Sequence, residues 1–209
     1  MAMAMSSACC DHPPPTSARP ILWIALAINL GMFLTEIVAG VVAGSVSLHA
    51  DALDFLGDSF NYAISLAVLG FALSWRAKAA LLKGATMAVL GLWVIGEAAW
   101  QVFAGRVPEP FVMGGIGMLA LAANGLVLAL LYRFREAEAN LRSAWICSRN
   151  DVAGNLAVLA AALGVLGTGT LWPDVIVAAV MAALALQGSV IVIRQSLAEL
   201  SGVASEARS

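Results

Sequence analysis

The sequence is poor in charged residues, and this scarcity excludes most soluble folds. Only 11% of its 209 residues are Asp, Glu, Lys or Arg, whereas 61% are hydrophobic. A soluble domain usually carries about 25% charged residues, because it needs a solvated surface. The composition therefore predicts a protein whose surface faces mostly lipid.

Cysteine and net positive charge are scarce as well. The three cysteines are an odd number and include an adjacent pair, which is not the pattern of a disulfide framework. The net charge of −2 provides no basic surface for nucleic acid. The sequence also lacks the His-Glu-x-x-His signature of zinc hydrolases and an evident pair of nucleophile and base. We therefore expect no nucleic-acid partner, no enzymatic activity and no resident cofactor.

Six long apolar segments are separated by breaks that contain turn-forming or charged residues. A helix needs about 20 apolar residues to cross a hydrocarbon core of ~30 Å. Helices of a soluble bundle would be shorter and amphipathic. We therefore predict an all-α bundle of six transmembrane helices. The expected spans are 21–43, 48–74, 80–104, 111–132, 143–166 and 174–194, with a break at Ser74–Arg76.

The expected domain organisation is simple. Residues 1–20 form a polar, proline-rich tail without an apolar stretch, so they do not resemble a secretory signal. We expect a flexible cytoplasmic tail there. Residues 21–200 are predicted to form the six-helix transmembrane transport domain, and 201–209 a short C-terminal tail.

Positive charge is concentrated on one side of the predicted bundle. Nine Lys and Arg residues fall in the two tails, the second loop and the fourth loop, whereas the opposite side has only Arg106. Cytoplasmic loops carry an excess of Lys and Arg, so we expect both termini in the cytoplasm. The nine residues are Arg19, Arg76, Lys78, Lys83, Arg133, Arg135, Arg142, Arg194 and Arg208.

Carboxylates occur inside the predicted spans, where each costs at least ~2.5 kcal/mol at the bilayer centre. In the second span, Asp54 and Asp58 lie four residues apart and so share one helix face. Two like charges at this spacing repel unless a cation or protons lie between them. The fifth span repeats the spacing with Cys147 and Asp151, a thiol and a carboxylate that can chelate one ion.

Together the two pairs supply three carboxylates and one sulfur. Four ligands that include a thiolate suit tetrahedral Zn²⁺ or Cd²⁺, whereas Mg²⁺ and Ca²⁺ prefer six or more oxygens. The depths of the two pairs leave a gap of about 9 Å, which a helix tilt of ~20° can close. Two alternatives stay open. Cys147 can be a buried apolar side chain, and Arg149 can pair with one of the carboxylates.

Other polar residues in the spans have several possible roles. We expect Asn29, Glu36 and Asn124 either to support the site or a proton path, or to form hydrogen bonds between helices. His49 and Asp51 are expected near the outer mouth, as an exit relay or as interfacial residues.

Two further groups lie near the ends of the bundle. Glu97 is expected near the outer end of the third span, where its side chain would snorkel to the interface. Cys9, Cys10 and His12 in the N-terminal tail are candidates for capturing metal in the cytoplasm.

Two stretches of the sequence carry a family resemblance. Asn29–Asp58 (NLGMFLTEIVAGVVAGSVSLHADALDFLGD) resembles the first two spans of the cation diffusion facilitators. In that family a Gly-Ser-rich turn leads into Ala-Asp-Ala, and an (Asp or His)-x-x-x-Asp pair follows. Asn140–Asn155 (NLRSAWICSRNDVAGN) is similar to the family's lead into His-x-x-x-Asp. The segments Trp172–Asp174 and Arg194–Leu197 are similar to the ends of its sixth helix, so the resemblance covers roughly 21–200.

The resemblance implies a function. It would place Asp54, Asp58, Cys147 and Asp151 at the four ligand positions of the transport site. The implied activity is efflux of a divalent metal from the cytoplasm in exchange for protons, by alternating access. Zn²⁺ or Cd²⁺ would be the first substrate, with Co²⁺ and Fe²⁺ as further candidates. It also implies a homodimer in the cell (inner) membrane.

The sequence departs from the family pattern in two places. Cys147 stands where the family usually has a histidine, which bears on metal preference. Family members also normally carry a cytoplasmic C-terminal domain, and we expect a short form that lacks it. Dimerisation through that domain is therefore not part of the expectation. The alternative function is a metal-binding membrane sensor or assembly partner without transport, and a flux measurement separates the two.

Overall fold

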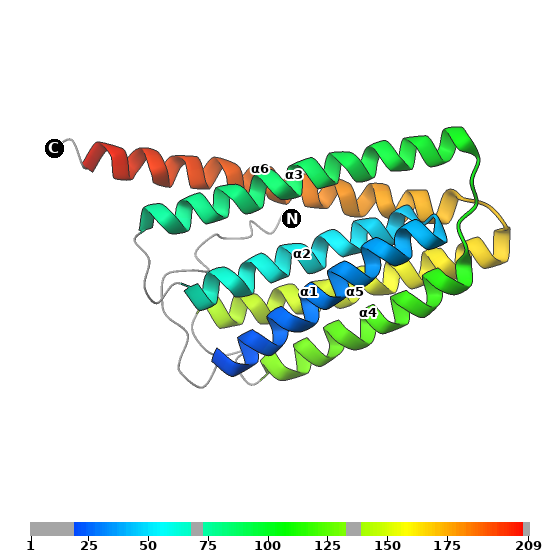
Figure 1. Cartoon of the computed structure of the whole chain (residues 1–209), viewed down its shortest axis with the longest axis horizontal. Helices are drawn as coiled ribbons and strands as arrows, with labels where there is room; N and C mark the ends of the chain where they lie inside the picture. Colours follow the sequence, from blue (N-terminus) through cyan, green and yellow to red (C-terminus); the bar gives the residue numbers. More distant parts are fainter. Residues whose placement is uncertain (1–18, 68–72, 133–138, 207–209) are drawn as a thin grey trace.

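The computed structural model describes residues 19–67, 73–132 and 139–206, and these ranges contain six α-helices and no strand (Figure 1). Side chains at 73, 74, 76, 139–147 and 202–206 lie outside the description. The prediction of an all-α, six-helix bundle is confirmed. The helices are α1 (Arg19–Ala43), α2 (Val46–Ala67), α3 (Leu73–Ala104), α4 (Pro110–Leu131), α5 (Ala139–Thr168) and α6 (Trp172–Glu206).

A glycine directly follows the last residue of α1, α3 and α5. Gly44, Gly105 and Gly169 have φ values of 64°, 63° and 64°, which a residue without a Cβ adopts at little cost. Helix α4 instead shows a clear start, because the Glu109 side chain accepts a hydrogen bond from the Val112 backbone N–H. The three glycines and the Glu109 cap therefore define the turns at one end of the bundle. The charge pattern predicts that this end faces the outside.

Three predicted boundaries are wrong. The second span was expected to reach residue 74 and the third to begin at residue 80, but α3 begins at Leu73. The sixth span was expected to end at residue 194, but α6 continues to Glu206. Arg76 and Arg194 end the apolar stretches without ending the helices, because arginine is a good helix former. Both helices are therefore longer than the hydrocarbon core requires.

Helix α2 is the innermost helix. Five helices in the described ranges are long and apolar enough to cross a membrane, and α2 is not among them. It carries His49 and three aspartates, which lower its hydropathy. Large apolar side chains are exposed on the other five helices, whereas α2 exposes none. A polar helix is stable inside the bundle because its neighbours, rather than the helix itself, contact lipid.

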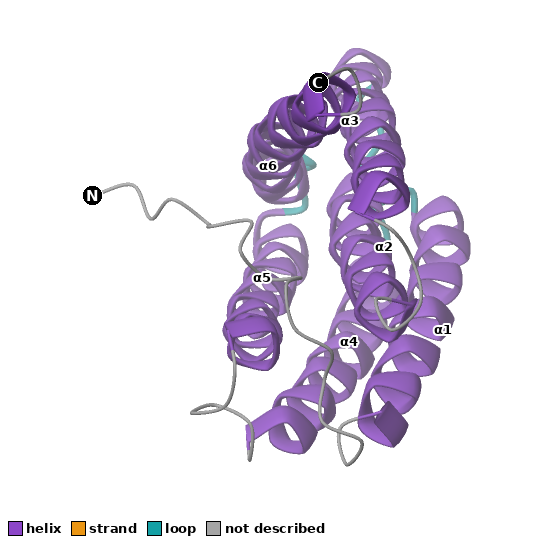
Figure 2. Ribbon diagram, turned by 90° about the vertical axis from the view of Figure 1, so that its left-hand side faces the viewer, coloured by secondary structure: helices purple, strands orange, loops and turns teal. Residues whose placement is uncertain are grey.

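The other helices surround α2 in two groups. Helices α3 and α6 lie side by side as a pair, with α1, α4 and α5 on the other side of α2 (Figures 1 and 2). Helix α2 contacts α1, α3, α5 and α6. Side chains that point from α2 in different directions therefore reach both groups.

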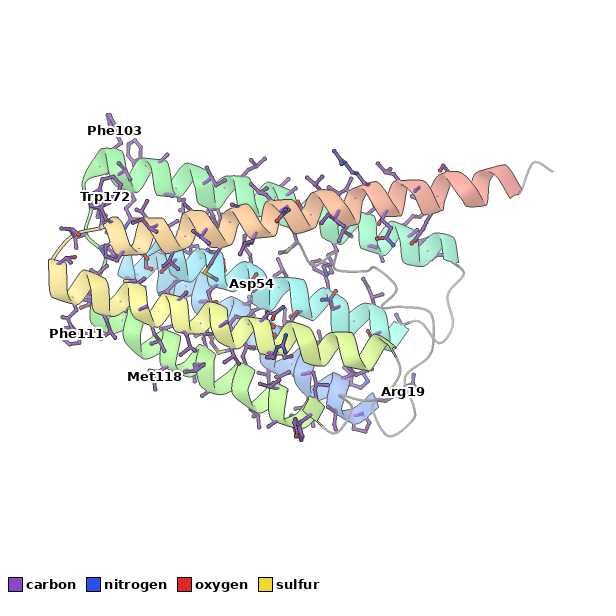
Figure 3. The ribbon with its side chains drawn as sticks, turned by 180° about the vertical axis from the view of Figure 1, so that it is seen from behind. Arg19, Asp54, Phe103, Phe111, Met118 and Trp172 are labelled. Atoms are coloured by element: carbon purple, nitrogen blue, oxygen red, sulfur yellow. The ribbon has the colours of Figure 1, made fainter. Side chains whose placement is uncertain are left out.

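The two ends of the bundle differ in the way that the charge pattern predicts. Phe103, Phe111 and Trp172 lie at one end and Arg19 lies at the other, with Asp54 between them (Figure 3). The three aromatic side chains are more than half exposed. Aromatic residues are typical of membrane interfaces, and Arg and Lys are typical of the cytoplasmic side. The excess of Lys and Arg therefore predicts that the end with Arg19 faces the cytoplasm.

Candidate metal site

Three aspartates lie along the face of α2 that points into the bundle. Asp51 and Asp58 are 1% and 8% exposed, and Asp54 is partly buried. The i, i+3 and i, i+4 spacings keep all three on neighbouring positions of one helix face. Such a row of buried carboxylates needs counter-ions, protons or hydrogen-bond donors.

Helix α5 supplies the opposite wall. The carboxyl groups of Asp58 and Asp151 lie within hydrogen-bonding reach of one another, so one proton can hold them together. One turn further along α5, Gly154 exposes backbone to the aspartates. A Cβ added there would lie 3.7 Å from Asp54 Oδ2 and 3.9 Å from Asp51 Oδ1. The absence of a side chain at Gly154 therefore lets the backbone of α5 pass close to the aspartates of α2.

An amide chain holds Asp51 in place. Asn155 Nδ2 lies 2.9 Å and 2.8 Å from the two Asp51 carboxylate oxygens and donates to them. Asn124 Nδ2 of α4 in turn donates to Asn155 Oδ1 over 2.9 Å. All three side chains are buried. Asn124 was expected either to support the site or a proton path, or to form a hydrogen bond between helices. It forms a hydrogen bond between helices, and this arrangement ties α2, α4 and α5 together.

Glu36 of α1 also approaches Asp51. Glu36 is 0% exposed, and its carboxyl group lies near that of Asp51. Neither Glu36 oxygen has a hydrogen-bond partner in the described structure. Asn29, in contrast, donates to the Ala25 carbonyl one turn earlier in α1, so its amide nitrogen is used within its own helix. Of the two α1 residues, Glu36 is the one that contacts the carboxylate cluster.

Polar groups line the side of Asp58 that faces the Arg19 end of the bundle. Tyr62 Oη lies 3.5 Å from Asp58 Oδ2 and 3.1 Å from Ser148 Oγ of α5. Lys83 of α3 bonds to Asn61 of α2 and places a positive charge near Asp58. These groups stand between the carboxylates and the end of the bundle where the cytoplasm is expected.

Cys147 lies in α5, but its side chain is outside the described residues. The expected ligand set of Asp54, Asp58, Cys147 and Asp151 therefore remains a prediction. Among the side chains that the structure does describe, no three His, Cys, Asp or Glu come together closely enough to hold a metal ion. Asp54, Asp58 and Asp151 are neighbours rather than a preformed ligand shell. Cys9, Cys10 and His12 also lie outside the described residues.

A further buried carboxylate, Asp174, links three helices at the outer end. Asp174 of α6 is 0% exposed and accepts hydrogen bonds from Val46 N (2.9 Å) and Ser47 N (3.1 Å) at the start of α2. It also accepts from Ser45 Oγ (2.7 Å) and from Gln101 Nε2 of α3 (3.2 Å). Asp174 caps the first turn of a helix more than 120 residues away, so sequence reasoning did not find this role.

His49 and Glu97 pair at the same end. His49 Nδ1 lies 2.5 Å from Glu97 Oε2, and His49 is 3% exposed. The prediction that Glu97 snorkels to the interface is therefore wrong, because its carboxylate turns towards α2. Hydropathy gives no sign of this pair, since its members lie 48 positions apart.

The chain is similar to known cation transporters over most of its length. Residues 22–201 match the model of the cation efflux transmembrane domain. The chain is 27% identical to zinc transporter ZitB of Escherichia coli, over 96% of this chain and 68% of that protein. It is 26% identical to metal cation efflux system protein CzcD of Cupriavidus metallidurans, over 90% of this chain and 63% of that protein. It is 24% identical to the cadmium, cobalt and zinc/H(+)-K(+) antiporter of Bacillus subtilis, over 86% and 62% respectively.

The fold and the buried carboxylates define a multi-pass helical membrane protein built around an intramembrane polar site. The chain belongs to the cation efflux transmembrane family, also called the cation diffusion facilitators. The relatives named above are cation transporters rather than enzymes. The resemblance found in the sequence is thereby confirmed.

Proposed function

We propose that this protein transports Zn²⁺ or Cd²⁺ across a membrane through a site between α2 and α5. The observation that carries the proposal is the meeting of Asp58 and Asp151, with Asp54 beside them, in the interior of a membrane-spanning bundle. Buried carboxylates without a function are costly in a membrane helix. A divalent cation offsets their mutual repulsion.

The ligand set consists of Asp54, Asp58, Asp151 and Cys147. Oxygen and thiolate ligands in a set of four favour Zn²⁺ and Cd²⁺ over Mg²⁺ and Ca²⁺. The names of the relatives, which include zinc, cadmium and cobalt, support the same group of metals. Fe²⁺ is a further candidate substrate.

Protons are the proposed counter-ion. Metal and protons compete for the same ligand atoms, so protonation releases the metal and metal binding releases protons. Asp58 and Asp151 are placed to share a proton when the ion has left. Alternating access then exposes the site to the cytoplasm for metal loading and to the outside for proton loading. The name of the Bacillus subtilis relative, which includes H(+) and K(+), supports antiport.

The proposed setting is efflux from the cytoplasm across the inner membrane, by a homodimer. The excess of Lys and Arg at the end of the bundle that holds Arg19 supports this orientation. The family implies the dimer.

The test is uptake of Zn²⁺ and Cd²⁺ into proteoliposomes that hold the full chain, under an imposed pH gradient in potassium-free buffer. The test variant is Asp151→Asn, which removes a charge without removing volume. Its matched control is Glu109→Gln, which neutralises an exposed carboxylate at the start of α4. We expect gradient-driven uptake in the wild type and in the control, and none in Asp151→Asn.

Two results would overturn the proposal. Uptake by Asp151→Asn at the wild-type rate would remove the site from the transport path. Metal binding without flux under any gradient would favour the alternative function, a metal-binding sensor or assembly partner.

A further inference from the structure

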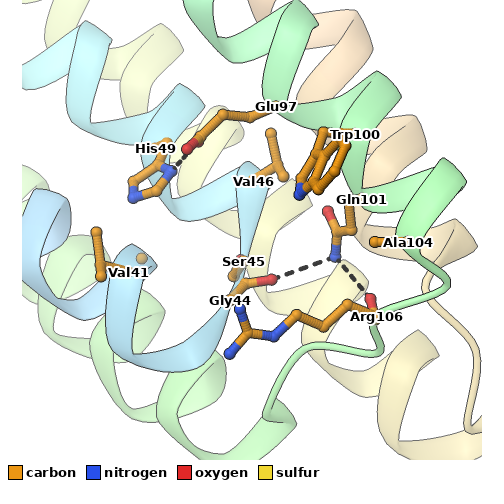
Figure 4. Close-up of a pocket in the computed structure, with 11 residues that line it drawn as sticks. Val41, Gly44, Ser45, Val46, His49, Glu97, Trp100, Gln101, Ala104 and Arg106 are labelled. Atoms are coloured by element: carbon orange, nitrogen blue, oxygen red, sulfur yellow. Dashed lines mark hydrogen bonds and ion pairs between the residues drawn. The ribbon is translucent and has the colours of Figure 1, made fainter.

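A cavity of about 180 Å³ lies at the outer end, between α1, α2 and α3 (Figure 4). Its polar lining includes His49, Glu97, Gln101 and Arg106, and its apolar lining includes Trp100. A cavity holds a water molecule in ~10–15 Å³ of such space, so this one accommodates a hydrated ion. None of the four predicted ligands of the central site lines it.

Three of the lining side chains present ligand atoms for a metal. His49 Nδ1 faces Glu97 at 2.5 Å, and Figure 4 shows this pair beside the cavity. Gln101 is 5% exposed, and its Oε1 has no hydrogen-bond partner in the described structure. Glu97 and Gln101 are four residues apart, so they lie one turn apart on the same face of α3. An unpartnered buried amide oxygen is costly, and a cation would satisfy it.

We propose that this outer cavity is a second binding site for the transported metal, in which His49, Glu97 and Gln101 receive the ion as it leaves the central site. Imidazole nitrogen, carboxylate and amide oxygen, completed by water, are suitable ligands for Zn²⁺ or Co²⁺. The role as an exit site rests on the proposed transport function. The binding of metal in the cavity does not.

The geometry combines a fixed ligand with an adjustable one. The His49 ring packs against α1 so closely that a Cβ on Gly40 would lie 2.3 Å from its Cδ2, and it lies 4.9 Å from the Trp93 ring. Glu97 is one-third exposed and extends on a long side chain. Two ligand atoms on a tetrahedral zinc ion stand roughly 3.3 Å apart, so the pair must widen by about 0.8 Å. A small rotation of Glu97 supplies this change.

The charge of the cavity favours weak binding. Arg106 lies at the end beside Gly44, where a Cβ would stand 3.4 Å from its Nε. The charges of Glu97 and Arg106 cancel when His49 is neutral, whereas the central site offers three carboxylates. A divalent ion is therefore held less tightly in the outer cavity than between α2 and α5, as release to the outside requires.

The test counts Co²⁺ ions bound per chain by equilibrium dialysis of the purified full chain. All samples carry substitutions that remove the metal-binding groups of the N-terminal tail: Cys9→Ser, Cys10→Ser and His12→Ala. A chain that also carries Asp54→Asn, Asp58→Asn and Asp151→Asn lacks the central carboxylates. We expect two ions in the parent chain and one weakly bound ion in the chain without central carboxylates.

The remaining ion is then assigned with variants of the outer cavity, made in the chain without central carboxylates. His49→Phe keeps the ring that packs on Gly40, and Glu97→Gln keeps the side-chain volume; each should abolish binding of this ion. Trp100→Phe, which alters the cavity lining without removing a ligand, should retain it. Elution as a single monodisperse species establishes that each variant is folded.

Two results would overturn this inference: no bound ion in the chain without central carboxylates, or an ion that both His49→Phe and Glu97→Gln leave in place. The outcome is separable from that of the proposed function. Two bound ions without flux would refute transport and leave the outer site standing. Flux with one ion per parent chain would refute only the outer site.

Discussion

Replacing Asp174 tests whether the outer ends of α2, α3 and α6 are joined through one carboxylate. Its two oxygens accept four hydrogen bonds, two of them from backbone N–H groups in the first turn of α2. Gln101 Nε2 also lies within hydrogen-bonding distance of the Gly44 and Arg106 carbonyls, so it keeps acceptors when Asp174 is removed. Asp174→Ala therefore orphans chiefly the N–H groups of Val46 and Ser47.

The magnitude follows from those two groups. A hydrogen bond to a charged acceptor contributes ~1.5–3 kcal/mol, and loss of a helix N-cap costs about 0.5–2 kcal/mol. Each of the two N–H groups loses such a bond, so we expect a loss of about 3 kcal/mol. A chain of this size loses ~2–4 °C of Tm per kcal/mol, which gives a decrease of roughly 6–12 °C. Asp174→Asn keeps one acceptor oxygen and should lose about half as much.

The assay is thermal unfolding of the purified protein in detergent, followed by the fraction that remains monodisperse after heating. Glu109→Ala is the matched control, because it removes an exposed carboxylate that caps α4 by accepting a hydrogen bond from the Val112 backbone N–H. That cap is worth about 1 kcal/mol. If Asp174→Ala lowers the Tm no more than Glu109→Ala does, the carboxylate does not join the helices and the reasoning is refuted.

Three further substitutions test the packing around the site. Gly154→Ala should leave zinc uptake close to wild type, because the new Cβ meets Asp54 at an ordinary contact distance of 3.7 Å. Gly154→Leu should abolish uptake. Equal uptake by the two variants would contradict the close approach of α5 to the aspartates. Asn155→Leu should lower the free energy of unfolding by ~2–3 kcal/mol, measured by denaturant titration, because Asp51 loses both hydrogen bonds from Asn155 Nδ2. An unchanged midpoint of the titration would contradict those bonds. Gly164→Ala should lower the free energy of unfolding by ~1–3 kcal/mol in the same titration, because its Cβ would stand 2.8 Å from the rigid ring of Pro173 at the start of α6. An unchanged free energy of unfolding would mean that α5 and α6 are not in contact there.

The sequence predicts most of this fold because lipid imposes simple rules. Apolar length gives the number of helices, and Gly44, Gly105 and Gly169 stand at the breaks because their φ values suit a chain reversal. The rules stop working where a helix leaves the lipid. Arg76 interrupts hydropathy but not the helix, so the start of α3 was predicted too late.

The candidate site is less predictable, because its contacts connect distant segments. The Asp54 and Asp58 pair is visible in the sequence as a helical spacing. The contact of Asp58 with Asp151 requires that α2 and α5 be neighbours. Hydropathy does not predict which helices are neighbours. Glu97 illustrates the limit best. An acidic residue near a span end predicts snorkelling, and only the tertiary fold places His49 opposite it.

The central claim is that the transported ion is held by Asp54, Asp58, Cys147 and Asp151. X-ray absorption spectroscopy of the zinc-loaded protein tests it most directly, because sulfur and oxygen ligands differ in distance. Zinc lies ~2.3 Å from sulfur and ~2.0–2.2 Å from carboxylate oxygen. The measurement uses a chain with Cys9→Ser and Cys10→Ser, loaded with less than one ion per chain.

The account predicts one sulfur in the zinc shell, lost in Cys147→Ser, and weaker zinc binding in Asp58→Asn. A zinc shell without sulfur while Cys147 is present, or zinc affinity unchanged in Asp58→Asn, would contradict the site between α2 and α5.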